Sequence, residues 1–288
     1  MVERTQLASG LEISRILTGL WQIADMEREG NFMNPEEGAL EMRRYVDAGL
    51  TTFDMADHYG TSELIAGQYE ADWPGSGELL TKWVPKPGIV AREKTRAAVE
   101  LALERMDREQ IDLLQFHAWS YSDPGWLDCM FCLQELKEEG LIQHLGLTNT
   151  DATHVAMLLN SGVDVVSNQV CYSLLDERAS SAMTDLCLQY DIKLLAFGTL
   201  AGGFLTEQWL GVPEPDCKSL QTWSQMKYKR FIDAAGGWGK FQVLLAALER
   251  VARRFEVSVA NVASRVILDA PAVAGVIIGA RLGKREHI

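Results

Sequence analysis

Four residues whose side chains could together transfer a proton lie at separate points of the chain. Asp54 and Tyr59 occur in the stretch TTFDMADHYG, Lys82 in ELLTKW and His117 in LLQFHAW. Each lies at or just after the end of a short apolar run, where a buried strand typically gives way to a loop. A carboxylate, a phenol, an ammonium and an imidazole would support general acid–base catalysis if the fold brought them together.

The combination of a tyrosine with a lysine has an electrostatic consequence. A tyrosine hydroxyl has a pKa near 10, which is too high for ready proton transfer at neutral pH. An ammonium about 4 Å away would contribute roughly 4 kcal/mol at an effective dielectric of about 20. We therefore expect Lys82 to lower the pKa of Tyr59, by up to about three units before desolvation is subtracted. Asp54 would keep Lys82 charged, and His117 would orient a carbonyl oxygen that Tyr59 protonates as general acid.

Each of the four residues also has a purely structural interpretation. Asp54 could cap the loop that follows it, and Lys82 could be a solvated strand end. His117 could be a hydrogen-bonded core histidine, and Tyr59 could simply pack within its loop. The structural interpretation requires four independent coincidences at the ends of three neighbouring runs. Their joint occurrence therefore favours an active site.

The composition excludes several classes of protein. The chain has 288 residues and is 47% hydrophobic and 23% charged, an ordinary globular balance. Its net charge of −13 repels phosphate backbones, so nucleic acid is not an expected partner. No stretch reaches the roughly 18 apolar residues of a membrane span, and the start MVERTQLASG is unlike a secretory signal. Five cysteines without a regular framework suit a reducing compartment, so we expect a cytoplasmic protein, with an organelle as the alternative.

Cys129 and Cys132 form a CxxC motif in GWLDCMFCLQELKEEG. Such a spacing can serve redox or metal chemistry. No second CxxC or nearby histidine pair completes a zinc set, and the motif lies inside an amphipathic helical pattern. We therefore predict core packing for both thiols and no metal site.

Short apolar runs alternate with helical patterns eight times along the chain. With 288 residues divided by eight, each unit has about 36 residues, enough for a strand and a crossover helix. The runs are continuous rather than alternating, as in parallel strands covered on both faces. The expected strands are ISRILTGLW (13–21), TTFDMA (51–56), ELLTKW (78–83), IDLLQFHAW (111–119), IQHLGLTN (142–149), VDVVSNQVCY (163–172), IKLLAFGTL (192–200) and VAGVIIGA (273–280).

Eight repeats favour a closed (β/α)8 barrel, a TIM barrel formed as a single domain over residues 1–288. An open doubly wound sheet is the alternative, but no GxGxxG follows the first run. The stretch TQLASGLEIS is predicted to form a hairpin across the barrel floor. Only RLGKREHI follows Ala280, so the barrel is expected to lack most of its last helix. In such barrels chemistry lies at the carboxyl ends of the strands, and neighbouring strands are about 4.8 Å apart.

From about residue 5 to 285 the chain resembles the aldo-keto reductase family. The matching stretches are GLTTFDMADHYGTSELIAGQY, LLTKW, LLQFHAW, LIQHLGLTNT, SNQVCYSLLDER, LLAFGTLAGGFLT and VAGVIIGAR. The resemblance implies that Asp54, Tyr59, Lys82 and His117 are the catalytic tetrad of the family. It implies NADP(H)-dependent, reversible reduction of an aldehyde or ketone, with hydride from nicotinamide C4 and the proton from Tyr59. A cofactor-binding regulatory module, similar to the potassium-channel β subunits, is the alternative.

The resemblance also implies where the cofactor would bind. The nicotinamide amide would meet Thr148, Asn149 and Gln169, whose donors and acceptors suit an amide. Phe197 would stack on the nicotinamide where many members have tyrosine, and Arg281 would bind the 2′-phosphate, supported by Lys284 and Arg285. Loop packing and a basic tail are the alternatives. The implied cofactor set is Gly19, Leu20, Trp21, Asp54, Thr148, Asn149, Gln169, Phe197, Gly198, Thr199, Leu200, Gly202, Ile278, Gly279 and Arg281.

Three tryptophans follow expected strand ends and could wall the substrate site with apolar surface, namely Trp21, Trp83 and Trp119. The segment 204–240 contains Pro213 and Pro215 and is expected to be a long irregular loop over the barrel mouth. The substrate itself would be a small carbonyl compound or alcohol. The family's Gln and Glu-Asn, expected on the following helix, are replaced by Arg285 or have no counterpart.

Overall fold

Eight parallel strands close into a barrel in the computed structural model, which describes residues 2–28, 30–88, 90–122, 124–220, 222–284 and 288. The last strand closes the ring by pairing with the first, with Val276 opposite Ile16. The predicted (β/α)8 fold is therefore confirmed. In barrel order the strands are β10 (Val273–Gly279), β3 (Ile16–Gly19), β4 (Thr52–Asp54), β5 (Glu78–Trp83), β6 (Ile111–Phe116), β7 (Ile142–Thr148), β8 (Ser167–Cys171) and β9 (Lys193–Phe197).

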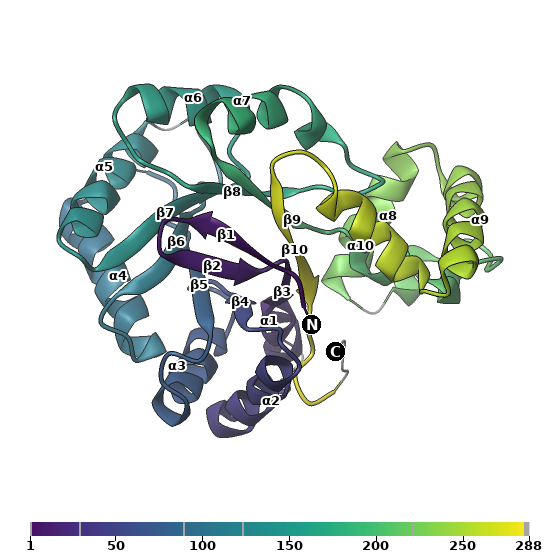
Figure 1. The fold of residues 1–288 in the computed structure, drawn as a ribbon, viewed down its shortest axis with the longest axis horizontal. Helices are drawn as coiled ribbons and strands as arrows, with labels where there is room; N and C mark the ends of the chain where they lie inside the picture. Colours follow the sequence, from purple (N-terminus) through teal and green to yellow (C-terminus); the bar gives the residue numbers. More distant parts are fainter. Residues whose placement is uncertain (1, 29, 89, 123, 221, 285–287) are drawn as a thin grey trace.

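Helices fill the gaps between strands and surround the barrel (Figure 1). Local signals start several of them: Asn34 caps α2 ahead of Pro35, and Ser258 begins α10 with a capping box. The helices that follow the strand order are α2 (Pro35–Asp47), α3 (Ser62–Asp72), α4 (Arg92–Met106), α5 (Gly125–Glu138), α6 (Ala152–Asn160), α7 (Ala182–Tyr190) and α10 (Val259–Leu268).

Two helices correct the sequence-based prediction. The run expected to be one strand from residue 13 to Trp21 instead contains the end of β2 (Leu11–Ser14), then β3, and then the start of helix α1 (Trp21–Arg28). The segment expected to be irregular contains helix α8 (Trp223–Ala234), which Thr222 caps by accepting from Gln225 N. Helices α8, α9 (Trp238–Phe255) and α10 pack together around a separate apolar cluster. This cluster lies on the side of the barrel formed by β9 and β10 (Figure 1).

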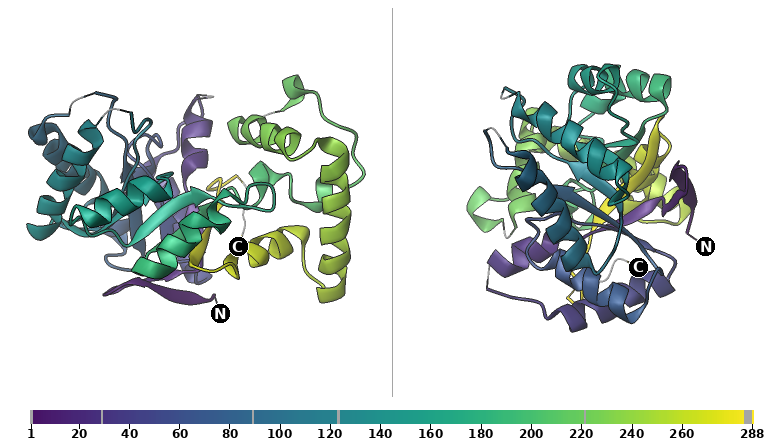
Figure 2. Two further views of the ribbon diagram at one scale, coloured as in Figure 1. Left: turned by 90° about the horizontal axis from the view of Figure 1, so that it is seen from above. Right: turned by 90° about the vertical axis from the view of Figure 1, so that its left-hand side faces the viewer.

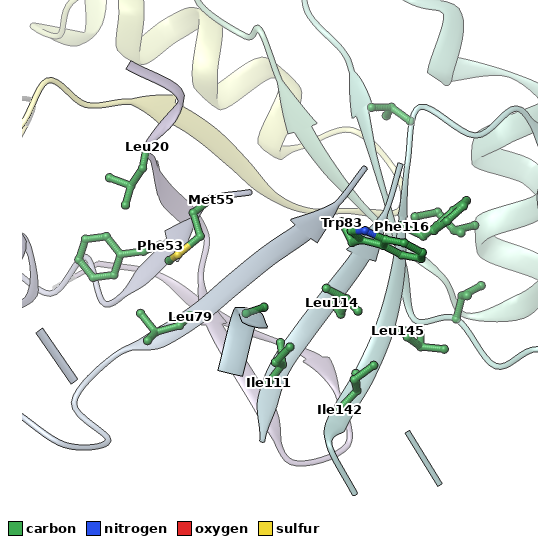
Figure 3. Close-up of a cluster of buried hydrophobic side chains, with 14 of the residues drawn as sticks. Leu20, Phe53, Met55, Leu79, Trp83, Ile111, Leu114, Phe116, Ile142 and Leu145 are labelled. Atoms are coloured by element: carbon green, nitrogen blue, oxygen red, sulfur yellow. The ribbon is translucent and has the colours of Figure 1, made fainter. Parts of the chain in front are cut away.

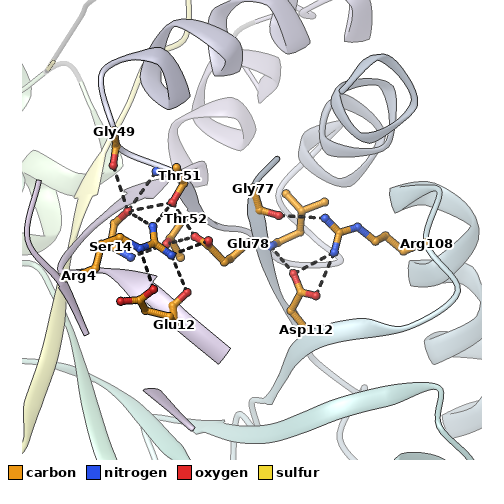
Figure 4. A network of polar contacts seen from close by, with 11 residues as sticks. Arg4, Glu12, Ser14, Gly49, Thr51, Thr52, Gly77, Glu78, Arg108 and Asp112 are labelled. Atoms are coloured by element: carbon orange, nitrogen blue, oxygen red, sulfur yellow. Dashed lines mark hydrogen bonds and ion pairs between the residues drawn. The ribbon is translucent and has the colours of Figure 1, made fainter. Parts of the chain in front are cut away.

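A hairpin of β1 (Arg4–Ala8) and β2 (Leu11–Ser14) lies beneath the barrel, as predicted (Figure 2, left). Its turn is held by His144, whose Nε2 lies 2.9 Å from Ser9 O. On the other side, Arg4 donates to Glu78 Oε1 at 2.8 Å at the start of β5 (Figure 4). The hairpin therefore closes the end of the barrel opposite to the carboxyl ends of the strands.

The main core lies between the barrel and its helices, and Figure 3 shows part of it around β4 to β7. Cys129 and Cys132 lie in this core with exposed fractions of 1% and 5%, which confirms the prediction that they pack there. Burial raises the pKa of both thiols, that of Cys129 to about 11, so neither is an activated nucleophile.

Beyond β10 the described chain from Ala280 to Lys284 forms turns rather than a helix. Arg285, which was expected to add positive charge here, lies outside the described residues. Over the part of the chain that the structure describes, no helix combines the length and apolarity needed to cross a membrane.

Candidate active site

A buried ion pair at the carboxyl ends of β4 and β5 forms the centre of the candidate site. The Nζ atom of Lys82 lies 2.8 Å from both carboxylate oxygens of Asp54 and 2.9 Å from Met55 O. The two residues are 1% and 3% exposed, so the pair is removed from water. Burial lowers the pKa of Lys82 and the Asp54 carboxylate opposes this shift, which keeps the ammonium form available.

Two glutamines hold the carboxylate of Asp54 in place. Gln115 on β6 donates to Asp54 Oδ1 at 3.1 Å, and Gln169 on β8 donates to the same atom at 2.7 Å. Gln169 also donates to Gln115 Oε1 at 2.8 Å, which links the two amides. The sequence-based prediction included Gln169 as a cofactor contact but missed Gln115, which lies on β6 two residues before His117.

Tyr59 lies in the loop after β4, with Lys82 Nζ 5.0 Å from its ring centroid. The side chains of Tyr59 and Lys82 therefore lie close together, as predicted. The predicted direction of the pKa shift is wrong. Burial, followed by the carboxylates of Asp54 and Asp57, raises the pKa of Tyr59. Burial disfavours the charged phenolate, and Asp54 offsets the positive charge of Lys82, so Tyr59 remains a protonated donor.

His117 follows β6 directly and faces the same rim. Burial and then the charge of Lys82 lower the pKa of His117 to about 4. The imidazole is therefore neutral at neutral pH and can donate one hydrogen bond to a substrate oxygen. Asn149 Nδ2 lies 3.5 Å from its Nε2, and the Trp119 ring centroid lies 5.1 Å from that of His117.

The unpredicted helix α1 fixes the loop that carries Tyr59. The ring of Trp21, its first residue, meets Tyr59 edge-on with centroids 5.0 Å apart. Further along, Glu27 Oε1 accepts from both the backbone N and the hydroxyl of Thr61, at 2.9 and 2.5 Å. Gly60 leaves room for this carboxylate, because a Cβ there would lie 2.1 Å from Glu27 Oε2. Helix α1 therefore clamps the loop from two sides.

Aromatic side chains wall the mouth above Tyr59. His58 lies between two of the predicted wall residues, with ring centroids 6.2 Å from Trp21 and 6.5 Å from Trp119. Its Nδ1 lies 2.8 Å from Asp57 Oδ1, and the sequence-based prediction did not include it. Trp83, by contrast, is buried against Phe116 in the outer core (Figure 3). The wall is thus formed by Trp21, His58 and Trp119, and Trp83 belongs to the core.

The residues expected to meet a nicotinamide amide lie together at the ends of β7 and β8. Thr148 pairs with Gln169 across the two strands, and Asn149 N donates to Gln169 O at 2.8 Å. The Thr148 hydroxyl is buried and has no hydrogen-bond partner among the described residues. Asn149 adopts a left-handed backbone with φ 55°. An unsatisfied buried hydroxyl beside an exposed amide fits a ligand amide that both donates and accepts.

The next part of the expected cofactor set runs from Phe197, the last residue of β9, to Gly202 and lies next to helix α8. Gly198 has φ 77°, and a Cβ there would lie 2.2 Å from Tyr228 Oη. Gly202 has φ 65°, and a Cβ there would lie 3.0 Å from the backbone of Ser224. Phe197 is partly exposed, and Thr199 and Leu200 complete this turn. The glycines are therefore required by the local geometry, because residues of helix α8 fill the space that a side chain at either position would need.

The remaining expected contacts lie where β10 meets β3. Gly279 pairs with Gly19, and Ile278 lies one residue earlier on the same strand. Leu20 is fully buried, so only its backbone, which donates to Asp54 O at 2.9 Å, faces the rim. Arg281 follows β10 and is partly exposed. The structure therefore brings the expected set to one rim of the barrel.

The fold is a (β/α)8 barrel with a buried ion pair at the carboxyl ends of its strands, which is where such barrels carry their active sites. Comparison with known proteins identifies the family. The model of the Aldo/keto reductase family matches residues 15–288, so the chain belongs to this family. It is therefore an oxidoreductase of carbonyl groups, and members of the family in general use a nicotinamide cofactor.

Two curated relatives and one solved structure illustrate this similarity. An uncharacterized oxidoreductase of Bacillus subtilis (strain 168), YcsN, is 31% identical over 70% of this chain and 72% of its own length. An NADH-specific methylglyoxal reductase of Escherichia coli (strain K12) is 27% identical over 68% of this chain and 66% of its own. The structure of a glycerol dehydrogenase from Gluconobacter oxydans superposes with a TM-score of 0.78 at 24% identity, covering 94% of this chain and 84% of that one.

Proposed function

We propose that the protein catalyses the NADP(H)-dependent reduction of an aldehyde or ketone to an alcohol, with Tyr59 as the proton donor. The observation that supports this most strongly is the convergence of Tyr59 and His117 on the buried Asp54–Lys82 pair. A bound nicotinamide supplies the hydride in such a reaction. Thr148, Asn149 and Gln169 would hold its amide, and the turn after Phe197 would receive its diphosphate.

The protein groups then handle the proton. Tyr59 is protonated because its burial raises its pKa, so its hydroxyl can donate to the carbonyl oxygen as negative charge develops there. Neutral His117 donates a second hydrogen bond to that oxygen and orients the carbonyl. The ammonium of Lys82 lies 5.0 Å from the ring and favours the phenolate that remains, whereas the carboxylate of Asp54 opposes the phenolate but fixes the direction of the ammonium.

Arg281 supports a preference for the phosphorylated cofactor. A guanidinium suits a phosphate group, and it lies at the rim of a chain whose net charge is −13. One relative is named NADH-specific, so the preference requires a direct test. We expect Arg281→Ala to weaken NADPH binding by about tenfold or more and NADH binding much less, since a charge-assisted bond contributes about 1.5–3 kcal/mol.

The experiment is a titration followed by turnover. Binding of NADPH and NADH to the purified protein is measured by quenching of tryptophan fluorescence. Consumption of the reduced cofactor is then followed by its near-ultraviolet absorbance with a panel of aldehydes and ketones. Consumption that requires both protein and carbonyl compound supports the proposal. Tight cofactor binding without consumption for any member of the panel would refute it and favour a regulatory module.

A further inference from the structure

Lys227, on the second turn of α8, is placed where the mechanism above does not use it. Its Nζ lies 4.8 Å from the ring centroid of Phe197 and 5.1 Å from that of Tyr228. Phe197 ends β9 at the rim that carries the candidate site. Helix α8 packs against the turn that follows, because the Tyr228 hydroxyl lies over Gly198. The ammonium therefore lies at the barrel mouth.

This ammonium has no carboxylate partner within ion-pair distance among the described residues. Its neighbours differ in this respect. Lys229, two residues later, is bound by Glu214 at 2.6 Å and by Asp233 at 2.5 Å. Arg178 is held by Asp176 at 2.6 Å. Lys227 thus has no ion pair of its own in the described part of the chain, although the charge of Asp176, which is bound to Arg178, opposes the lowering of its pKa.

The charge of Lys227 acts on the catalytic rim. It is one of the charges that lower the pKa of His117, together with Lys82 and His58. Its own pKa is lowered, first by partial burial. A desolvated cation without a counter-ion at a binding site is stabilised by an anionic ligand, which replaces the lost water.

We propose that Lys227 binds the carboxylate of the substrate, so that the enzyme acts on carbonyl compounds that carry a second, anionic group. This inference rests on the reductase function proposed above. The aromatic wall of Trp21 and Trp119 would cover the apolar body of such a substrate while its carboxylate reaches Lys227. The local cation also counteracts the general repulsion of anions by an acidic surface.

The test compares two substrates with the same reacting group, 4-carboxybenzaldehyde and its methyl ester. Steady-state kcat/KM for both is measured for the wild type, Lys227→Met, Lys227→Arg and the control Lys94→Met. Lys94 is exposed on α4, so its variant removes the same charge away from α8. We expect Lys227→Met to reduce the ratio of kcat/KM for the acid to kcat/KM for the ester by about tenfold or more, equivalent to about 1.4 kcal/mol.

Lys227→Arg should keep most of the preference for the acid, and Lys94→Met should keep all of it. Added salt should reduce the preference of the wild type, because it screens a partly exposed ion pair. An unchanged ratio in Lys227→Met would overturn the inference. So would an equal loss for acid and ester accompanied by weaker NADPH binding, which would make Lys227 a cofactor contact. If the wild type reduces neither aldehyde nor any other carbonyl compound, the proposed function itself fails.

Discussion

Removing either charge of the Asp54–Lys82 pair should leave the other one buried without a partner. The ammonium donates to both oxygens of Asp54 at 2.8 Å, and both residues are almost fully buried. Breaking a buried pair by removing one partner costs about 3–5 kcal/mol of unfolding free energy, whereas removing both charges costs much less. We therefore expect Asp54→Asn and Lys82→Met each to lose about 3–5 kcal/mol, which corresponds to a melting temperature roughly 10 °C lower.

The double variant separates this explanation from simple loss of packing. Its loss of unfolding free energy should be at least about 2 kcal/mol smaller than the sum of the two single losses. Urea unfolding followed by tryptophan fluorescence gives the three values by linear extrapolation. The matched control is the exposed pair of Arg43 and Asp47, 2.7 Å apart on α2, whose coupling should be about 0.5 kcal/mol or less.

Additive losses in the double variant would refute the reasoning. Additivity within about 0.5 kcal/mol would mean that the two groups do not interact in the native state. Lys82 would then be neutral in the native state, and only Gln115 and Gln169 would stabilise the carboxylate of Asp54. In that case Lys82 could not supply the charge that stabilises a phenolate in the proposed reaction.

Three further predictions concern pH, loop position and helix packing. His117 has a folded pKa of about 4 against 6.5 for the unfolded chain, so the unfolded state binds the proton between these values. The free energy of unfolding should therefore fall by at most about 3 kcal/mol as the pH drops from 6.5 to 4. Urea unfolding measured across this pH range should show a smaller fall for His117→Gln than for the wild type. Glu27→Ala should lower kcat more than it raises KM, because it releases the loop that carries Tyr59, whereas Glu27→Gln should retain most of the activity. Equal kcat and KM values for the two variants would exclude a role of the Glu27–Thr61 contact in holding this loop. Gly67→Ala should lower the free energy of unfolding by about 1–3 kcal/mol, measured by thermal unfolding, because the added Cβ would lie 2.1 Å from Arg105 O. The control Gly239→Ala has open space around its added Cβ and should not lower the free energy of unfolding.

The barrel and the four central residues could be predicted because the signals that specify them are local. Continuous apolar runs at regular spacing predicted the strands, and ionisable residues at the ends of three neighbouring strands predicted the site at the rim. The two helices that were missed have weaker signals. Helix α1 has only eight residues directly after β3, and α8 lies between prolines and the glycines at 236 and 237. The Thr222 cap could have indicated α8, since Gln225 follows it three residues later.

Relations that depend on three-dimensional charge balance could not be read from the chain. The pKa of Tyr59 is raised first by burial and then by the carboxylates of Asp54 and Asp57, whereas the sequence-based prediction gave a magnitude for the charge of Lys82 alone, before desolvation. Lys227 and Glu27 gain their roles from helices whose positions were unknown. Trp83 was expected in the wall because it lies at a strand end, but successive strand residues point to opposite faces, and this one faces the core.

The account depends most directly on the hydroxyl of Tyr59, and Tyr59→Phe removes that atom alone. The measurement is turnover with reduced nicotinamide and an aldehyde, together with cofactor titration on the same preparation. General acid catalysis predicts a fall in kcat of about 10²–10⁴-fold, with cofactor affinity and the urea midpoint close to those of the wild type. Turnover at the wild-type rate in this variant would contradict the assignment of Tyr59 as the proton donor.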